Sequence, residues 1–251
     1  MKPKNQILEV WGELACFSRP EMKVERFSYP VITPSAARGI FDAIYCKPVE
    51  FRWQIKRIDI LQPFGHDASS SVSYLALRRN EVKEKVSVNA VADWMKGGSE
   101  PVPIYADVDR DYWGNDTRGR TQRQTMALRD VHYYLHAEIR PWEGFENHIQ
   151  ALEGQFRRRA KHGKCIYQPY LGCREFPAWF SLIEEKEPPE CPASMDMDVG
   201  LMLYDVFDLS RPGNSLDEPS ISLFRASVKG GVLNVPEYDS PDVLKGERRA
   251  D

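Results

Sequence analysis

The stretch "FRRRAKHGKC", residues 156–165, gathers cationic side chains in a chain whose formal net charge is −3. Such clusters hold phosphate groups, and contacts to the phosphate backbone dominate the affinity of proteins for nucleic acids. A solvated helix end is the alternative, because basic residues near a helix C-terminus interact favourably with its dipole. That alternative explains one or two charges better than five. We therefore favour a phosphate site formed by Arg157, Arg158, Arg159, Lys161 and Lys164.

His132 and His136 offer a different chemistry, because two histidines four residues apart on a helix can share a metal ion. The surrounding segment "MALRDVHYYLHAEI" alternates between apolar and polar residues, which predicts a strand. On a strand the two rings are ~13 Å apart, at about 3.3 Å per residue. One ion with bonds of ~2 Å cannot bridge them. We therefore expect no metal site and no cofactor, with both histidines facing outward, where they can still touch a ligand.

The elements that position the cationic cluster can be read from apolar spacing. A helix is expected at about 146–162, ending at Gly163, and its buried stripe comprises Ile149, Leu152, Phe156 and Ala160. An earlier helix begins after Thr33, with Pro34 at its first position, and ends before Pro48. Its expected buried stripe is Ala36, Ile40, Ala43 and Ile44.

Strands are expected at 6–17, 51–61, 126–139 and 174–183. The alternation in the second strand slips at Lys56 and Arg57, which predicts a bulge there. In the third strand, Val131, Tyr133, Leu135, Ala137 and Ile139 face inward, whereas His132, Tyr134, His136 and Glu138 face outward. Residues 62–125 are irregular and indicate an extended insertion, a hairpin arm for instance, without a core of its own.

The order of these elements predicts an α+β fold: a ferredoxin-like (RRM-like) βαββαβ domain over residues 1–183, with a long insertion between the second and third core strands. Apolar runs separated by Pro, Gly and Asn follow, so residues 184–251 are expected to form a small antiparallel β-rich C-terminal domain with an acidic tail. Sheets of this kind often read single-stranded RNA by aromatic stacking, although the fold alone serves many functions.

Composition limits the class of protein. The chain has 251 residues, of which 42% are hydrophobic and 28% charged, values typical of a soluble globular protein. It shows no apolar run long enough to span a membrane and no signal peptide. The five cysteines form no CxxC pair, which favours reduced thiols in a cytoplasm. Residues 175–251 carry 7 basic and 16 acidic side chains, so the rest of the chain is net basic, as a polyanion-binding body would be.

A family resemblance is carried by four blocks in order: "RPEMKVERFSYPVITPSAARGIFDAIYCKP", "LRRNEV", "LRDVHYYLHAEI" and "RRRAKHGKCIYQPYLGCREFPA". These blocks resemble the type I-C CRISPR-associated Cas-five family of RAMP proteins. The resemblance implies a metal-independent endoribonuclease that cuts CRISPR repeat RNA (pre-crRNA) and stays on the 5′ handle of the guide. It further implies a surveillance complex with backbone and large subunits, with DNA as a further partner. The insertion near 97–117 is longer than the family pattern.

The resemblance also implies a catalytic site: a tyrosine near the end of the first helix and a Lys-His pair early in the second. Tyr45 matches the tyrosine, and its place beside the apolar stripe suggests that its hydroxyl reaches solvent. The family positions of the pair fall near Ala151 and Leu152, which carry no such chemistry. The substitutes are His148, preceded by Asn147, and the pair formed by Lys161 and His162.

RNA cleavage of this kind needs a base for the ribose 2′-OH, an acid for the leaving 5′-oxygen and a cation for the phosphorane. We assign Tyr45 and His148 as acid and base candidates, with Arg158 and Lys161 as phosphate holders. In simpler structural roles, Tyr45 packs at the helix end and His148 is solvated. The other RNA-binding candidates are Arg19, Lys23, Arg26, Arg38, Arg123, Arg157, Arg159, Lys164 and Arg174. The alternative function is a non-catalytic RNA-binding subunit that caps the crRNA 5′ handle.

Overall fold

The computed structural model describes residues 3–22, 24–61, 72–104, 119–184, 190–213 and 219–246. Its contacts divide the chain into two compact units. The larger unit comprises Met1–Leu75 and Met126–Asp251, and the smaller comprises Ala76–Thr125.

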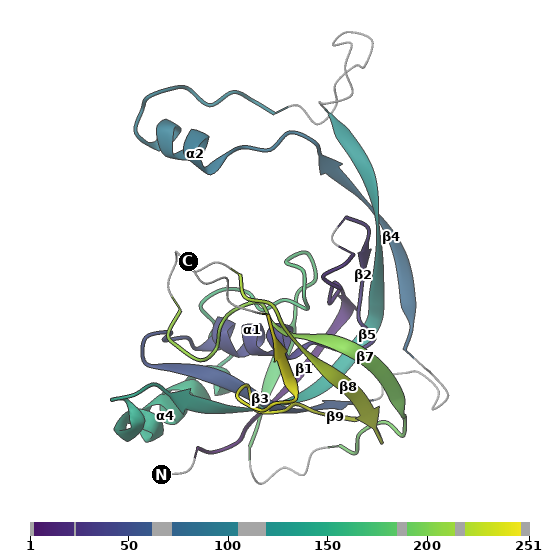
Figure 1. Cartoon of the computed structure of the whole chain (residues 1–251), viewed down its shortest axis with the longest axis vertical. Coiled ribbons are helices and arrows are strands. Elements are labelled where there is room, and N and C mark those ends of the chain that lie inside the picture. The colour runs from purple at the N-terminus through teal and green to yellow at the C-terminus, as the bar shows by residue number, and fades with distance from the viewer. Residues whose placement is uncertain are drawn as a thin grey trace. The chain divides into compact units, whose positions relative to one another are not determined.

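Four antiparallel strands form the centre of the larger unit. They are β1 (Gln6–Ala15), β3 (Phe51–Ile60), β5 (Arg120–Pro141) and β6 (Trp179–Ile183), and they lie in the order β3-β5-β1-β6. Figure 1 labels β1, β3 and β5 of this group. The short strand β2 (Arg26–Phe27) also pairs with β5. The predicted bulge in β3 is confirmed, because its register with β5 shifts between Ile55 and Arg57.

Two helices follow β1 and β5. In α1 (Pro34–Ile44) the Thr33 hydroxyl accepts a hydrogen bond of 3.2 Å from Ala36 N, which confirms the predicted cap. A 3-10 turn, η1 (Glu146–His148), leads into α4 (Ile149–Lys161), and Gly163 follows with φ +63°. The four residues of the predicted α4 stripe are all buried. In α1 one expected residue differs, since Ala36 is half-buried and Ala37 is buried instead.

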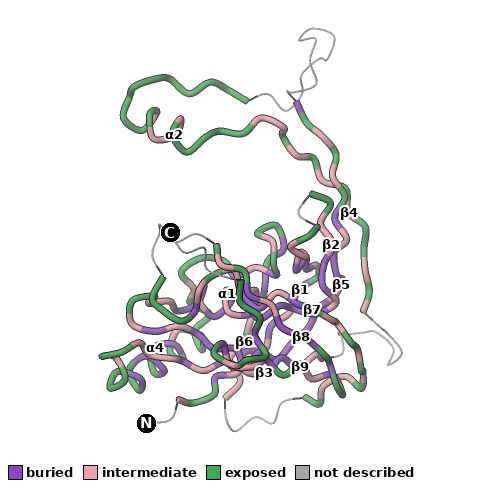
Figure 2. Tube along the Cα trace, in the orientation of Figure 1, coloured by how far each residue is buried: buried purple, intermediate pink, exposed green. Residues whose placement is uncertain are grey.

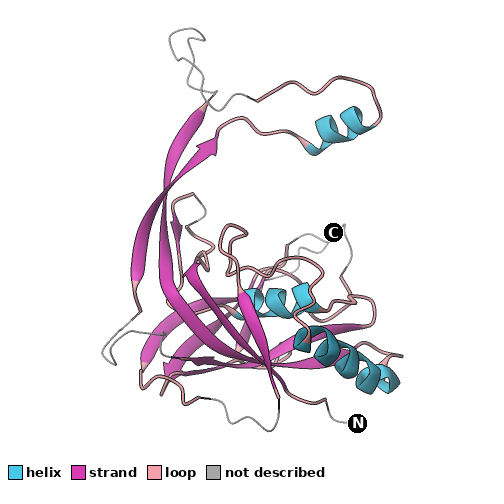
Figure 3. Cartoon of the chain, turned by 180° about the vertical axis from the view of Figure 1, so that it is seen from behind, coloured by secondary structure: helices cyan, strands magenta, loops and turns pink. Residues whose placement is uncertain are grey.

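Both helices cover the same face of the sheet. The Trp53 ring on β3 lies 4.8 Å from Phe41 of α1 and 4.7 Å from Phe156 of α4. The Phe41 and Phe156 rings are 5.6 Å apart. Because one side chain on one face of β3 contacts both helices, they form a single layer over the sheet (Figure 3). The core of the larger unit lies between this layer and the sheet.

The opposite face of β5 differs from the prediction. His132, Tyr134 and His136 are buried rather than outward-facing. His132 Nε2 lies 2.9 Å from Glu9 Oε1, and His136 Nε2 lies 3.1 Å from Asp59 Oδ2. Local alternation identifies the two faces of a strand, but it does not show whether the second face is covered. Here paired carboxylates and the segment around Glu190, whose N–H donates to Tyr134, cover it.

The C-terminal strands extend the same sheet. They are β7 (Met197–Asp205), β8 (Ser222–Lys229), β9 (Val232–Asn234) and β10 (Val243–Lys245). They are antiparallel, as expected, and β9 pairs directly with β3. Residues 247–251, the end of the expected C-terminal part, lie outside the described residues.

The smaller unit, Ala76–Thr125, contains a strand pair, as expected for a hairpin arm, and a helix that the sequence did not predict. Strand β4 (Tyr74–Val82) pairs with β5, and helix α2 (Val88–Met95) follows with Ser87 as its cap. None of the α2 residues is buried (Figure 2). Residues 105–118, most of the long insertion near 97–117, lie outside the described residues.

The segment before β6 was predicted as strand from residue 174, but β6 begins at Trp179. Residues 170–177 form a turn closed by a bridge between Tyr170 and Pro177. Gly172 in this turn has φ +83°, and a Cβ there would lie 2.1 Å from the Cys16 carbonyl oxygen. Only glycine tolerates both conditions. No helix in the described residues is long and apolar enough to cross a membrane.

Candidate active site at the end of the first helix

The C-terminal end of α1 is held by α4 and by the loop that follows α4. A helix leaves its last carbonyl groups without intrahelical partners. In this chain, Arg159 Nε donates to the Ile44 carbonyl oxygen at 2.6 Å, and Ile166 N donates to the Ala43 carbonyl oxygen at 2.6 Å. The positive charge of Arg159 also suits the negative end of the α1 dipole. These contacts fix the residue that follows, Tyr45.

Tyr45 is the C-terminal cap of α1, with φ −152° and ψ 114°. Trp53 Nε1 donates to its carbonyl oxygen at 2.9 Å, and its ring centroid lies 5.5 Å from that of Phe51. The residue is only 8% exposed, so most of its side chain packs in the core. Packing between core aromatics leaves the phenol at the edge of the core, beside polar groups.

Lys47 is the polar neighbour of Tyr45 that sequence reasoning missed. Its charge acts on the Tyr45 hydroxyl, and its Nζ donates to Glu50 Oε1 at 2.7 Å. The bond to Glu50 is the main reason that the pKa of Lys47 is raised. The signal was present in "YCKP", because an extended residue at position 45 turns the side chains of Tyr45 and Lys47 to the same side.

The protonation state of Tyr45 follows from this environment. Burial raises the pKa of its hydroxyl above the ordinary value. The Lys47 and Arg159 charges act in the opposite direction without cancelling the effect, and Glu50 adds to the rise. At neutral pH the phenol is therefore protonated. It can donate a hydrogen bond or a proton, and two cations lie within electrostatic range of it.

His148 lies at the other end of α4 and is exposed. Its ring lies 5.7 Å from Phe145, and its side chain makes no capping hydrogen bond. The preceding turn is bonded to the loop that carries Lys47: Trp142 N donates to Glu50 O at 2.9 Å, and Trp142 Nε1 donates to Pro48 O at 2.8 Å. Among the described residues, no hydrogen bond or ring contact joins His148 to Tyr45. The end of α1 and the turn before α4 therefore flank the same loop, 45–50, and His148 follows that turn.

The Lys-His pair at the end of α4 is engaged elsewhere. Lys161 Nζ lies 2.5 Å from Glu184 Oε1 in an exposed ion pair. His162 Nδ1 donates to the Arg158 carbonyl oxygen at 2.8 Å, which caps the end of α4. Among the described residues, no hydrogen bond or ion pair joins either side chain to Tyr45.

The model of the family described as CRISPR-associated protein (Cas_Cas5) matches residues 7–236 of the chain. The chain belongs to this family.

Two relatives share much of the sequence of this Cas5 chain. One, the CRISPR pre-crRNA endoribonuclease Cas5d of Mannheimia succiniciproducens, is 38% identical over 244 residues, which covers 95% of this chain and 97% of the relative. The other carries the same name in Thermus thermophilus and is 36% identical over 244 residues, covering 91% of this chain and 90% of the relative.

Two solved structures share the fold at low sequence identity. A structure described as a CRISPR-associated protein has a TM-score of 0.61 and 18% identity, and covers 97% of this chain and 98% of its own. The functionally uncharacterized protein SMU1763c of Streptococcus mutans has a TM-score of 0.56 and 18% identity, and covers 96% and 97%. At this identity the likeness shows the fold alone.

The remaining cations of the α4 end differ in how freely they can reach a ligand. Arg158 is exposed and donates to Gln155 Oε1 at 2.7 Å on the same helix. Arg157 is half-buried. Lys164 is exposed, and its backbone N–H donates to Arg159 O at 2.9 Å, which closes the helix. Arg158 and Lys164 are therefore best placed to contact phosphate.

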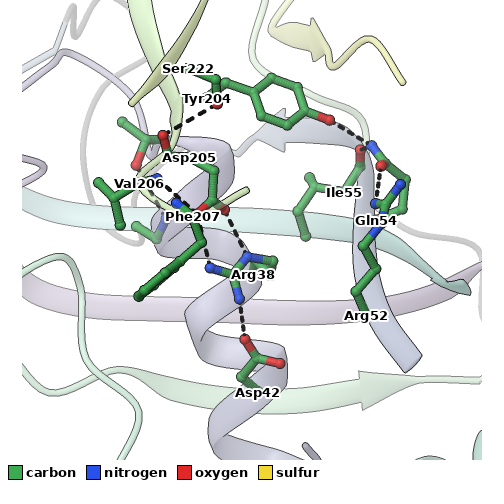
Figure 4. Close-up of polar contacts among 12 residues, drawn as sticks. Arg38, Asp42, Arg52, Gln54, Ile55, Tyr204, Asp205, Val206, Phe207 and Ser222 are labelled. Atoms are coloured by element: carbon green, nitrogen blue, oxygen red, sulfur yellow. Dashed lines mark hydrogen bonds and ion pairs between the residues drawn. The ribbon is translucent and has the colours of Figure 1, made fainter. Parts of the chain in front are cut away.

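Arg38 has a structural role in this Cas5 chain, which does not support the predicted RNA contact. Its Nε and NH2 atoms donate to the two carboxylate oxygens of Asp205 at 2.7 and 3.0 Å, and NH1 lies 2.5 Å from Asp42 (Figure 4). The side chain is largely buried. These carboxylates raise the pKa of Arg38 and balance its charge, so it links α1 to β7.

The other predicted RNA contacts have mixed environments. Arg26 donates to Glu175 at 2.6 Å, so Glu175 pairs with Arg26 rather than with its neighbour Arg174, which is exposed. The Arg19 guanidinium lies 4.5 Å above the Tyr29 ring. In the smaller unit, Arg123 lies 3.7 Å from Glu81. Lys23 lies outside the described residues.

Proposed function

We propose that this Cas5 chain is a metal-independent endoribonuclease that cuts CRISPR repeat RNA (pre-crRNA) and stays bound to the 5′ handle of the product. The observation that carries the proposal is identity of 38% and 36%, over nearly the whole chain, with two proteins named pre-crRNA endoribonucleases. The site geometry supports it, because a protonated phenol at a fixed helix end has two cations within electrostatic range.

The reaction we propose is attack of the ribose 2′-oxygen on the adjacent phosphorus. The bond to the 5′-oxygen breaks, which leaves a 2′,3′-cyclic phosphate and a 5′-hydroxyl. Tyr45, protonated at neutral pH, donates its proton toward the leaving oxygen. Lys47 and Arg159 stabilise the charge that develops on the phosphorane. His148, exposed on the other side of loop 45–50, accepts the proton of the 2′-OH.

We infer that the core of the larger unit is ferredoxin-like, as the sequence suggested. Two observations support this inference. The strand order β3-β5-β1-β6 is antiparallel throughout, and both helices cover one face. In the larger unit Arg159 of α4 bonds the end of α1, and the turn before α4 bonds loop 45–50. This arrangement gives the chemistry a rigid support.

A test of the proposed function is incubation of the purified chain with a synthetic repeat RNA from its own CRISPR array, in buffer containing EDTA. We expect one cut per repeat, and a single 2′-deoxy substitution at the cut nucleotide should block it. Tyr45→Phe should lower the cleavage rate about 100-fold or more while binding is retained, because a proton-transfer group contributes mainly in the transition state. If the wild-type chain binds the repeat RNA and leaves it uncut, the proposal is contradicted.

A second candidate function is a non-catalytic subunit that caps the crRNA 5′ handle. The observation that favours it is the α4 face where the family pattern places the Lys-His pair. Leu152 is buried there, and Ala151 has no titratable group. In both functions the partners are CRISPR RNA and the other subunits of a type I-C surveillance complex. The EDTA experiment separates the two functions, since only the enzyme shortens the RNA.

A further inference from the structure

The loop after α4 exposes two large apolar side chains beside the proposed site. Ile166 is 57% exposed and Tyr167 is 47% exposed. The Tyr167 ring lies 6.5 Å from that of the half-buried Tyr170, at an angle of 33°. The proposed reaction does not use either residue.

Tyr167 is exposed on a loop that is held at both ends. On one side, Ile166 N donates to Ala43 O at 2.6 Å, and Lys164 N donates to Arg159 O at 2.9 Å. On the other side, Ala178 N donates to Pro169 O at 2.9 Å. The ring is therefore presented in a fixed place without being buried. A ligand that stacks on it meets little cost in ordering the loop.

Cationic side chains lie on the segments that adjoin the loop of Tyr167. The neighbouring backbone contacts lead to Lys164 and Arg159 on one side and to the end of α1 on the other. The Asp42 carboxylate lies near the Tyr167 hydroxyl and helps to raise its pKa, after partial burial. Arg38 already balances that carboxylate through an ion pair. Exposed aromatics interleaved with cations are typical of surfaces that bind single-stranded nucleic acid.

We propose that Tyr167 is a stacking platform for one unpaired base of the RNA, next to the phosphodiester that lies at Tyr45. The hydrogen bond from Ile166 to Ala43, two residues before Tyr45, places the two side chains on neighbouring segments. The inference rests on the proposed function for its ligand. It adds a base contact that helps to fix which phosphodiester meets Tyr45. Stacking on an aromatic ring tolerates any base, so this residue sets position rather than sequence.

The test combines protein variants with damaged RNA. Tyr167→Ala, Tyr167→Phe and wild type are titrated with the synthetic repeat RNA and with a series of RNAs that each lack one base. Phe207→Ala serves as the control, because Phe207 is a comparably exposed aromatic, 53%, on another segment. Loss of one stacked base is expected to weaken binding about 5- to 150-fold.

We expect Tyr167→Ala to weaken binding of the intact RNA by that factor, whereas Tyr167→Phe and Phe207→Ala bind like wild type. With the RNA that lacks the stacked base, the affinity of wild type should fall to that of Tyr167→Ala. The affinity of Tyr167→Ala for this RNA should equal its affinity for the intact RNA. If the loss of affinity from Tyr167→Ala and the loss from removing a base add up at every position of the RNA, the inference is overturned. The inference is also overturned if Tyr167→Ala binds the intact RNA as tightly as wild type does. In that case Ile166 and Tyr167 would be exposed for contact with another protein. Cleavage by wild type in EDTA, followed in the same samples, tests the proposed function separately.

Discussion

Arg159 Nε donates a hydrogen bond of 2.6 Å to the carbonyl oxygen of Ile44, the last residue of α1. One residue of the cationic cluster thus belongs to the fold as well as to the proposed site. Its partner precedes Tyr45 in the chain. Any change to Arg159 therefore alters the support of the phenol together with the local charge.

Arg159→Ala should destabilise the protein. A hydrogen bond from a charged donor to a buried carbonyl contributes roughly 1–2 kcal/mol when the donor is partly exposed. Arg158→Ala is the matched control, because Arg158 is exposed and its side chain donates to Gln155 on the same helix. Its effect on the free energy of unfolding should stay within about 0.5 kcal/mol. Urea unfolding of both variants measures the difference, and equal effects would mean that the bond to Ile44 adds no stability.

Arg158→Ala combined with Lys164→Ala should flatten the salt dependence of RNA binding. Each phosphate contact to a single strand contributes about −0.7 to the slope of log affinity against log salt. Loss of two contacts should reduce the slope by about 1.4. Arg225→Ala with Lys229→Ala removes the same charge from exposed positions on β8 and should leave the slope unchanged. If both double variants reduce the slope of log affinity against log salt by the same amount, the cations at the α4 end act only through the net charge of the protein.

The sequence predicted the elements whose signals are local. Thr33 before Pro34 indicated the start of α1, and the phase slip at Arg57 indicated the bulge, because each depends on neighbouring residues alone. Contacts between distant segments were not predictable in this way. Arg38 was assigned to RNA because nothing near it in the sequence shows that Asp205, 167 positions away, neutralises it.

The candidate site shows the same division. Tyr45 was found through family resemblance, whereas Lys47 was overlooked although it is only two residues away. The link between Arg159 and α1 depends on how the two helices pack, and helical periodicity predicts only which face of each is buried. His132 and His136 were placed outward for a similar reason. The groups that cover them come from β1 and β3.

Tyr204 should make the protein less stable at high pH. Burial raises its pKa to about 12, and its hydroxyl accepts from Gln54 at 2.8 Å and donates to Pro236 O at 2.9 Å. Below pH 10 this tyrosine is protonated in both the folded and the unfolded chain. Between pH 10 and 12 the unfolded chain loses the proton first, so the free energy of unfolding falls, by about 2–3 kcal/mol for a shift of about 2 units.

Tyr204→Phe separates this titration from other alkaline effects. At pH 8 the variant should lose about 1 kcal/mol, because it leaves Gln54 and the Pro236 carbonyl oxygen without their shared partner. Between pH 10 and 12 the free energy of unfolding of the variant should then fall less steeply than that of wild type. The two slopes against pH should differ by an amount equivalent to at most one bound proton. Parallel curves from denaturant unfolding across this range would show that Tyr204 does not keep its proton in the folded state.

The choice of proton acceptor can be decided between His148 and His162. His148 flanks the loop that carries Lys47, through the turn at Trp142, whereas His162 is bonded to the Arg158 carbonyl at the far end of α4. We therefore expect His148→Ala to lower single-turnover cleavage about 100-fold or more with nearly unchanged RNA affinity. His162→Ala should cut at close to the wild-type rate. If His162→Ala carries the defect instead, the RNA must approach α4 from its other end. If both variants cut normally, Tyr45 with Lys47 and Arg159 must perform the reaction without histidine.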